Sequence, residues 1–214
     1  MPRPTPTPVF HFTRVEHRPT IIESGLHCDR RAQAEGVLAI EVGNTDVKAL
    51  RSTRSVSLDP GGVVADYVPF YFAPRSPMLY VISRGGVPSY QDGQHRIIYL
   101  CSTLERLHDL GLDVVLSDRN AAMRVADFHR WADGEPEDGF IDWPLMKETI
   151  WSSDDEHPDR MERRMAECLV HGSVPWEALM FVGARDQTVA DEVVSLVGTD
   201  ESAPSVAVRR HWYF

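Results

Sequence analysis

Apolar positions along the chain follow two spacings, and each predicts its own kind of element. Alternating or continuous apolar runs between turn residues are typical of strands, and they fall at 9–13, 97–100, 113–117, 179–183 and 205–208. Helical spacing and capping signals are typical of helices, and they fall at 20–23, 44–54, 102–111, 120–132, 158–171 and 188–196. Because these elements mix without strict βαβ alternation, the pattern predicts an α+β fold.

Two stretches follow neither spacing. Residues 133–157 are rich in glycine, proline and acidic side chains, which predicts a long loop of the kind that is usually functional or disordered. Residues 1–8 include four prolines and predict a flexible arm. Residues 9–214 show neither a repeat nor an internal linker, so we expect one domain there.

The charge of the chain is unevenly distributed. A formal net charge of −10 in 214 residues argues against a protein that coats nucleic acid non-specifically. However, residues 1–130 sum to +1 and residues 131–214 to −11. Of the 22 basic residues, all but Lys48 and Lys147 are arginines, so the first part of the chain is compatible with phosphate contacts. A GC-rich genome, which favours arginine codons, explains the arginine excess equally well.

Cysteine usage and missing motifs exclude several classes of protein. The three cysteines form no C-x-x-C pair, which disfavours a disulfide framework or zinc knuckle and favours the cytoplasm. No apolar run approaches the roughly 20 residues of a membrane span, and the proline-rich start is not a signal peptide. The motifs H-E-x-x-H, G-x-x-x-x-G-K-[ST], G-x-G-x-x-G and G-x-S-x-G are absent. We therefore expect no metal and no membrane partner.

Each single candidate residue has a structural and a functional interpretation. Glu167 has apolar neighbours and is either a helix-surface glutamate or a carboxylate kept dry for chemistry. Arg51 and Arg54 share a helix face and are either solvated or bind an anion. His11 and Thr13 point to one side of a strand, where they either bind a polar ligand or pack in the core.

An aromatic segment at 67–80 is the most unusual part of the chain. Its three prolines exclude one continuous central strand. Single-stranded bases stack on aromatic faces and guanidinium planes, although part of such a cluster normally belongs to the core. The cluster comprises Tyr67, Phe70, Tyr71, Phe72, Arg75 and Tyr80.

Four blocks of sequence are more specific than these single residues. They are His11–His17 with Ile21–Leu26, Val47–Arg51, Asp66–Tyr80, and Ala166–Val170 with Val174–Pro175. Weaker similarities are Leu116–Ala122, Asp142–Trp143 and Trp212–Phe214. Together the blocks resemble the DarT family, the DNA-modifying ADP-ribosyltransferase toxins of toxin–antitoxin systems. The resemblance extends over nearly the whole chain, from about residue 9 to the end.

The resemblance implies a fold, an activity and partners. The fold is an ADP-ribosyltransferase fold, in which a split mixed β-sheet with flanking helices holds NAD⁺ in a cleft. The activity is sequence-specific transfer of ADP-ribose from NAD⁺, as co-substrate, to thymine in single-stranded DNA, with release of nicotinamide. The partner is a DarG-like antitoxin with a macrodomain. Open alternatives are guanine as the target base, a protein or RNA acceptor, plain NAD⁺ hydrolysis, and a nucleic-acid-binding module with an inactive site.

The resemblance also assigns catalytic and cofactor-binding residues. Glu167 matches the catalytic glutamate of the family, whose charge stabilises the positive ribose. Arg51 matches its functional arginine, which contacts NAD⁺ and supports the transfer. His11, Phe12 and Thr13 match the segment that holds nicotinamide.

Further segments correspond to the NAD⁺ and DNA sides of the site. Residues 35–53 match an element over the NAD⁺ site, and the stretch from about Asp118 to Glu167 matches the substrate-recognition loop. Candidates for DNA contact are Tyr71, Arg75 and Arg119. The sequence departs from the family in two features, which are Leu50 in place of a second basic residue and the acidity of residues 131–162.

Overall fold

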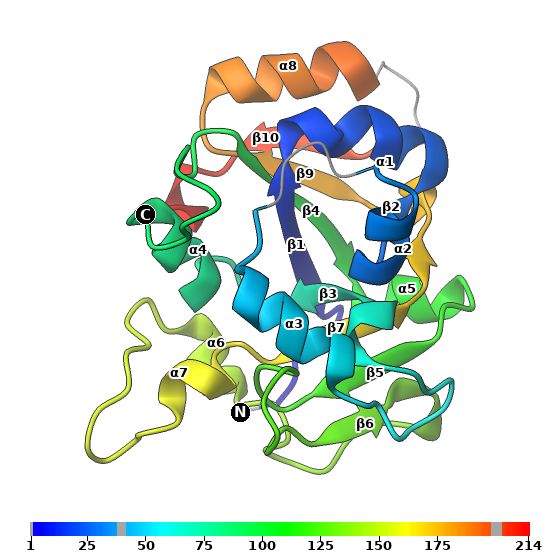
Figure 1. Ribbon diagram of the computed structural model, residues 1–214, viewed down its shortest axis with the longest axis vertical. Coiled ribbons are helices and arrows are strands. Elements are labelled where there is room, and N and C mark those ends of the chain that lie inside the picture. Colours follow the sequence, from blue (N-terminus) through cyan, green and yellow to red (C-terminus); the bar gives the residue numbers. More distant parts are fainter. Residues whose placement is uncertain (1, 38–41, 198–202) are drawn as a thin grey trace.

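The structure is a computed structural model that describes residues 2–37, 42–197 and 203–214 (Figure 1). Its centre is an eight-stranded mixed sheet with strand order β10-β9-β4-β1-β3-β7-β5-β6. The strands are β1 (Pro8–Arg14), β3 (Tyr67–Tyr71), β4 (Ile97–Thr103), β5 (Val114–Ser117), β6 (Phe128–Arg130), β7 (Glu167–His171), β9 (Phe181–Ala184) and β10 (Ser205–Val208). A separate two-stranded ribbon pairs β2 (Leu26–His27) with β8 (Ser173–Val174).

Short helices flank the sheet. They are α1 (Arg18–Ser24), α2 (Asp29–Ala34), α3 (Thr45–Thr53), α4 (Pro77–Ser83), α5 (Leu104–Asp109), α6 (Trp143–Lys147), α7 (Arg160–Arg163) and α8 (Gln187–Val197). Single 3-10 turns are η1 (Val15–His17), η2 (Val64–Asp66), η3 (Trp131–Asp133), η4 (Trp176–Ala178) and η5 (Arg210–Trp212). Among the described residues, no helix is long and apolar enough to cross a membrane. The predicted α+β class is confirmed.

The sheet is split between β1 and β3. β1 pairs with β4 at seven positions, whereas its pairing with β3 is limited to Phe10 opposite Tyr71. In Figure 1, β1 and β4 lie in the upper half of the molecule, and β3, β7, β5 and β6 lie in the lower half. The expected split mixed sheet is therefore present, and its two halves diverge beside α3.

Helix α3 places a buried cation at this split. Asn44 caps the helix, because its side-chain oxygen accepts the backbone N–H groups of Asp46 and Val47. The helix ends at Thr53, close to the predicted end at Arg54, and Arg51 is its buried residue. The segment 35–53 expected over the NAD⁺ site thus includes α3, while residues 38–41 of that segment lie outside the described residues.

Most predicted elements are confirmed to within a few residues. The strands predicted at 9–13, 97–100, 113–117, 179–183 and 205–208 correspond to β1, β4, β5, β9 and β10. The helices predicted at 20–23, 44–54, 102–111 and 188–196 correspond to α1, α3, α5 and α8. The long irregular excursion at 133–157 contains only the end of η3 and the short α6.

Two predicted helices are wrong. The stretch 120–132 forms turns followed by β6 and η3, and the stretch 158–171 forms the one-turn α7 followed by strand β7. In the second stretch the apolar run Cys168–Val170 pairs with β3 on one side and β5 on the other. A fully buried central strand reads as a continuous apolar run, and short runs of this kind are ambiguous between helix and strand. Glu167 therefore begins a strand instead of lying in a helix.

The predicted arm at 1–8 packs against the domain where it is described. Strand β1 already begins at Pro8, and Thr7 is fully buried. The guanidinium of Arg3 contacts the carboxylates of Glu105 and Glu135. The flexibility of this arm, and a single domain over 9–214, stay predictions.

Gly183 in β9 supplies the space in which the Trp212 ring lies. A Cβ atom at this position would lie 2.4 Å from Cζ3 of Trp212. We expect Gly183→Ala to lower the free energy of unfolding by about 2 kcal/mol, because overpacking a rigid ring forces the backbone to shift. Urea unfolding measures this, with the double variant Gly183→Ala/Trp212→Leu as control. The double variant should lose less than the sum of its parts, and a strictly additive result would contradict the packing argument.

Candidate active site

A cavity of about 360 Å³ lies where the two halves of the sheet diverge. β1 and the η1 turn form one wall, α3 and α4 form further walls, and the ends of β3 and β7 reach it from the other half of the sheet. A cavity of this size, with apolar walls and few polar groups, is typical of a small-molecule site. Among the described residues, no group of His, Cys, Asp and Glu side chains is placed to hold a metal ion.

A buried ion pair between Arg51 and Glu167 lies in the wall of this cavity. One guanidinium nitrogen of Arg51, Nη1, lies 3.0 Å from Oε1 and 2.9 Å from Oε2 of Glu167. Only 7% of Arg51 and 1% of Glu167 are exposed. Burial alone would lower the pKa of Arg51, but the adjacent Glu167 charge outweighs it and raises the pKa. Arg51 therefore stays charged, and both side chains of the pair are almost completely shielded from solvent.

The carboxylate of Glu167 is fixed by the strand on which it lies and by a neighbouring turn. Glu167 is the first residue of β7, opposite Tyr71 of β3 and Ser117 of β5. Its backbone N–H donates to Oγ of Ser117 at 3.3 Å, and the N–H of Ala121 donates to its Oε1 at 3.4 Å. Rigid neighbours on both sides give this side chain the fixed orientation that a catalytic group needs.

Arg51 keeps a hydrogen-bond donor unused. Its second terminal nitrogen, Nη2, is buried and has no partner among the described residues. Burying a polar group without a hydrogen bond is unfavourable, so this donor indicates a ligand that completes the site. A ligand with an oxygen acceptor, such as a phosphate or a ribose hydroxyl, suits a guanidinium.

Tyr71 closes the cavity next to the ion pair. Its ring stacks on Phe12 with the centroids 6.1 Å apart and the planes 17° from parallel. Burial, together with the nearby charge of Glu167, raises the pKa of Tyr71. The hydroxyl group therefore stays protonated and can donate a hydrogen bond at neutral pH.

Three polar side chains line the β1 wall of the cavity. His11 Nδ1 lies 2.8 Å from the carbonyl oxygen of Pro69, which makes Nδ1 the protonated nitrogen and leaves Nε2 as an acceptor. Burial lowers the pKa of His11 to about 4, so its ring is neutral at pH 7. The hydroxyl of Thr13 lies 2.9 Å from Nδ1 of His17.

The structure brings together most of the predicted site residues, but not all of them. His11, Phe12, Thr13, Arg51, Tyr71 and Glu167 all line the cavity. Arg75 and Arg119 are not among the lining residues. The Arg75 guanidinium lies 4.4 Å from the centre of the Phe214 ring, and Arg119 pairs with Asp118 and Asp159.

Some lining residues were not singled out by the sequence. His17, Met78 and Asn120 line the cavity. They belong, in this order, to the similar segments His11–His17, Asp66–Tyr80 and Leu116–Ala122. The sequence therefore indicated only that these residues lie in segments similar to the family. It did not distinguish the residues that line the cavity from their neighbours in the same segments.

The aromatic segment at 67–80 has a mixed role. Tyr67, Phe70 and Phe72 are buried in the core, whereas Tyr71 lines the cavity and Tyr80 is 40% exposed. The alternation of a strand explains this division, because Phe70 and Phe72 point away from the side on which Tyr71 lies.

Comparisons with known proteins agree with this geometry. The model of the DarT family, described as ssDNA thymidine ADP-ribosyltransferase, matches residues 10–214. A DNA ADP-ribosyl transferase from Thermus sp. (strain 2.9) is 32% identical over 213 residues, which cover 99% of this chain and 98% of that protein.

Two solved structures of Thermus sp. 2.9 DarT are also similar to this chain. The complex with ADP-ribosylated ssDNA has a TM-score of 0.88 at 30% identity and covers 100% of this chain and 99% of that chain. The complex with NAD⁺ has a TM-score of 0.84 at 30% identity and covers 100% of both chains.

Fold, cavity and comparisons together define the class of the protein. It is an NAD-dependent DNA ADP-ribosyltransferase, and its split mixed sheet is an ADP-ribosyltransferase fold. Within this class, the chain belongs to the DarT family.

The buried ion pair predicts a strong energetic coupling between its two members. Removing one partner leaves the other buried charge uncompensated, so Arg51→Met and Glu167→Gln should each lower the free energy of unfolding by about 3 kcal/mol. The double variant should lose clearly less than the sum of the two. Chemical denaturation of the four proteins measures the coupling energy, and a coupling near zero would show that the pair does not form.

His11 predicts a loss of stability at mildly acidic pH. The folded chain keeps His11 neutral down to a pKa of about 4, whereas the unfolded chain takes up a proton near the ordinary value of 6.5. The free energy of unfolding should therefore fall as the pH drops below about 6.5, by about 2 kcal/mol at pH 5 from this residue alone.

The variant His11→Asn isolates this contribution, because an amide nitrogen can still donate to the carbonyl of Pro69. Stability measured between pH 8 and pH 5 should fall less in His11→Asn than in the wild type, while His108→Asn, at an exposed position, should behave like the wild type. An unchanged pH dependence in His11→Asn would contradict the neutral state of the His11 ring.

Proposed function

We propose that the chain transfers ADP-ribose from NAD⁺ to thymine in single-stranded DNA in a sequence-specific manner, and that it acts in the cytoplasm as the toxin of a toxin–antitoxin pair. The observation that carries this proposal is the buried Arg51–Glu167 pair in the wall of an apolar cavity. The thymine target is further supported by the description of the family to which the chain belongs. The partner that we propose is a DarG-like macrodomain antitoxin, as the family resemblance implies.

The residues of the cavity fit NAD⁺. Arg51, whose buried Nη2 donor has no partner among the described residues, and the polar side chains of β1 line a cavity that is otherwise largely apolar. Phe12 offers a ring on which the flat nicotinamide can stack, and the Thr13 hydroxyl and nearby backbone groups can hold its carboxamide. NAD⁺ supplies the ADP-ribosyl group, with nicotinamide as the leaving group.

Glu167 is the catalytic carboxylate in this proposal. Its negative charge stabilises the positive charge that develops on the ribose as the bond to nicotinamide lengthens, and it also holds a ribose hydroxyl. The carboxylate is fixed and almost dry, so its field is stronger than it would be in water. No metal takes part in this mechanism.

Arg51 orients the reacting groups and does not remove a proton. A guanidinium stays protonated at neutral pH and is a poor general base, and the charge of Glu167 raises the pKa of Arg51 further. During transfer, the bond between ribose carbon and nicotinamide nitrogen breaks, and its electron pair returns to the nicotinamide ring. A ring nitrogen of the base bonds to the same ribose carbon, and the proton of that nitrogen leaves to water.

Single-stranded DNA is the acceptor that suits a reaction in this cavity. A base must leave its stack to reach the ion pair, which is far easier in a single strand than in a duplex. Tyr71 is the residue that we propose to contact the incoming base. We propose Arg75 as a contact to the strand outside the cavity, because its guanidinium lies on the Phe214 ring and stacked groups of this kind bind single strands.

Mass spectrometry of oligonucleotides tests the proposed function. The chain is incubated with NAD⁺ and a set of single-stranded oligonucleotides that each lack one base, with the annealed duplexes alongside. We expect a mass gain of one ADP-ribose, release of nicotinamide, no reaction where thymine is missing, an adduct on thymine when the modified strands are fragmented, and a much slower reaction on duplexes.

The matched variant is Glu167→Gln, which keeps the shape of the side chain but removes its charge. We expect the transfer rate to fall by at least about 100-fold, with a folded chain shown by circular dichroism. An adduct on guanine after fragmentation of the modified strands would assign guanine as the target base. Labelling of protein or RNA in place of DNA, or full activity of Glu167→Gln, would contradict the proposal.

A further inference from the structure

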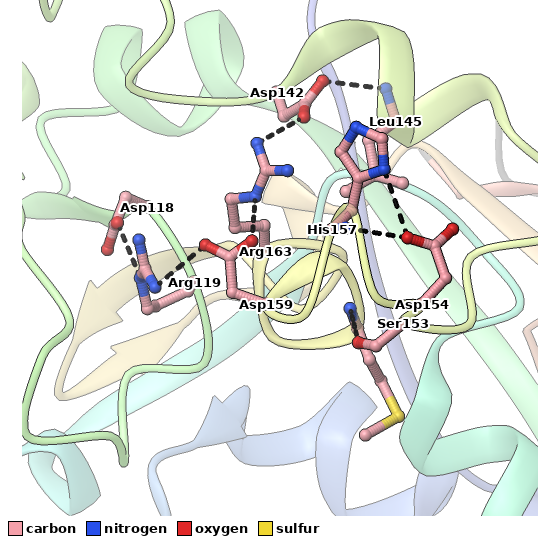
Figure 2. A network of polar contacts seen from close by, with 10 residues as sticks. Asp118, Arg119, Asp142, Leu145, Ser153, Asp154, His157, Asp159 and Arg163 are labelled. Atoms are coloured by element: carbon pink, nitrogen blue, oxygen red, sulfur yellow. Dashed lines mark hydrogen bonds and ion pairs between the residues drawn. The ribbon is translucent and has the colours of Figure 1, made fainter.

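Two arginines beside the active site are each shared between two aspartates. Nε of Arg119 lies 2.8 Å from Asp118, and Nη1 of Arg119 lies 3.4 Å from Asp159. Nη1 of Arg163 lies 2.8 Å from Asp142, and its Nε lies 3.2 Å from Asp159. Figure 2 shows Asp159 between the two guanidinium groups, so that this carboxylate joins both halves of the network.

The network holds the turn that supports the catalytic carboxylate. Residues 117–121, here called the support turn, begin at the last residue of β5. Within it, Oγ of Ser117 donates to the carbonyl of Arg119 at 2.8 Å and accepts the backbone N–H of Glu167 at 3.3 Å. The N–H of Ala121 donates to Oε1 of Glu167 at 3.4 Å. The two residues that contact Glu167, Ser117 and Ala121, therefore lie two positions before and two positions after Arg119.

The support turn is also fixed to the segment that carries Asp159. The N–H of Asn120 donates to the carbonyl of Glu162 in α7 at 3.2 Å, one helical turn after Asp159. The Arg119–Asp159 contact and this hydrogen bond join the same two segments at neighbouring points. Together they determine where the support turn lies relative to β7.

We propose that Arg119 and Asp159 are positioning residues, which hold the support turn so that Ser117 and Ala121 fix Glu167 for transfer. This inference rests on the proposed function of Glu167. It gives Arg119 a role different from the DNA contact that the sequence suggests. A guanidinium paired with two carboxylates has its charge already compensated, so it has little to offer a phosphate.

A variant that removes the charge of Asp159 distinguishes the two roles, because one role predicts tighter oligonucleotide binding and the other predicts slower transfer. If the network acted only through its charge near DNA, removing the negative charge of Asp159 would reduce repulsion and strengthen binding of the oligonucleotide. If Asp159 positions the support turn, removing its charge loosens Glu167 and slows the transfer instead. Small displacements of a catalytic group are known to have large effects on rate.

Steady-state kinetics of Asp159→Asn, Arg119→Gln and the double variant test the proposal. We expect each single variant to lower kcat about tenfold, with KM for the oligonucleotide within about twofold of the wild type. The double variant should be no slower than either single variant, because both act through one contact. Asp155→Asn, which removes an exposed acid of the same loop, should keep the wild-type kcat.

A second measurement does not depend on activity. Amide hydrogen exchange at Glu167 and Ala121 should become faster in Asp159→Asn and Arg119→Gln but not in Asp155→Asn, while the melting temperatures stay close to that of the wild type. An inactive wild type would therefore refute the proposed function, and the exchange data would still decide on the positioning role.

Two results would overturn the positioning role. One is unchanged exchange and an unchanged kcat in Asp159→Asn. The other is a raised KM for the oligonucleotide in Arg119→Gln with a normal kcat. In that case the slope of log affinity for the oligonucleotide against log salt concentration would also decrease by about one, which identifies a lost phosphate contact.

Discussion

The buried ion pair between Arg51 and Glu167 is the interaction on which the rest of the structure depends. Two charges removed from water are unfavourable unless each compensates the other and further hydrogen bonds hold them. The split between β1 and β3 provides the place for the pair, since α3 inserts Arg51 there and β7 begins there with Glu167. The remaining donor of Arg51 and the apolar walls around it then define what the cavity can bind.

The acidity of residues 131–214 is compatible with a DNA substrate because part of it is compensated locally. Asp142 and Asp159 each pair with an arginine of the network next to the active site. These arginines are consequently not free to bind phosphates, so attraction to DNA has to come from stacking and from a small number of other cations. Such a protein is expected to bind a few nucleotides with modest affinity and a shallow salt dependence.

The sequence predicts the fold class and five of the eight strands of the main sheet, and six of the eight residues that it names for the site line the cavity, because these features depend on local spacing or on specific blocks. It places Glu167 wrongly in a helix, because the buried run Cys168–Val170 has no alternation and is a strand only through its neighbours β3 and β5. Arg75 and Arg119 do not line the cavity, and each contacts a residue that is remote in sequence, namely Phe214 and Asp159. Contacts of this kind leave no pattern in the local sequence.

A crystal structure of the chain with a carba analogue of NAD⁺, which cannot lose nicotinamide, tests whether the buried ion pair holds the co-substrate. We expect the analogue in the cavity between β1, α3 and β7, with the carboxylate of Glu167 at hydrogen-bond distance from the nicotinamide-side ribose and Nη2 of Arg51 bonded to a ribose or phosphate oxygen. An analogue bound elsewhere, or bound with Nη2 of Arg51 still without a partner, would contradict it.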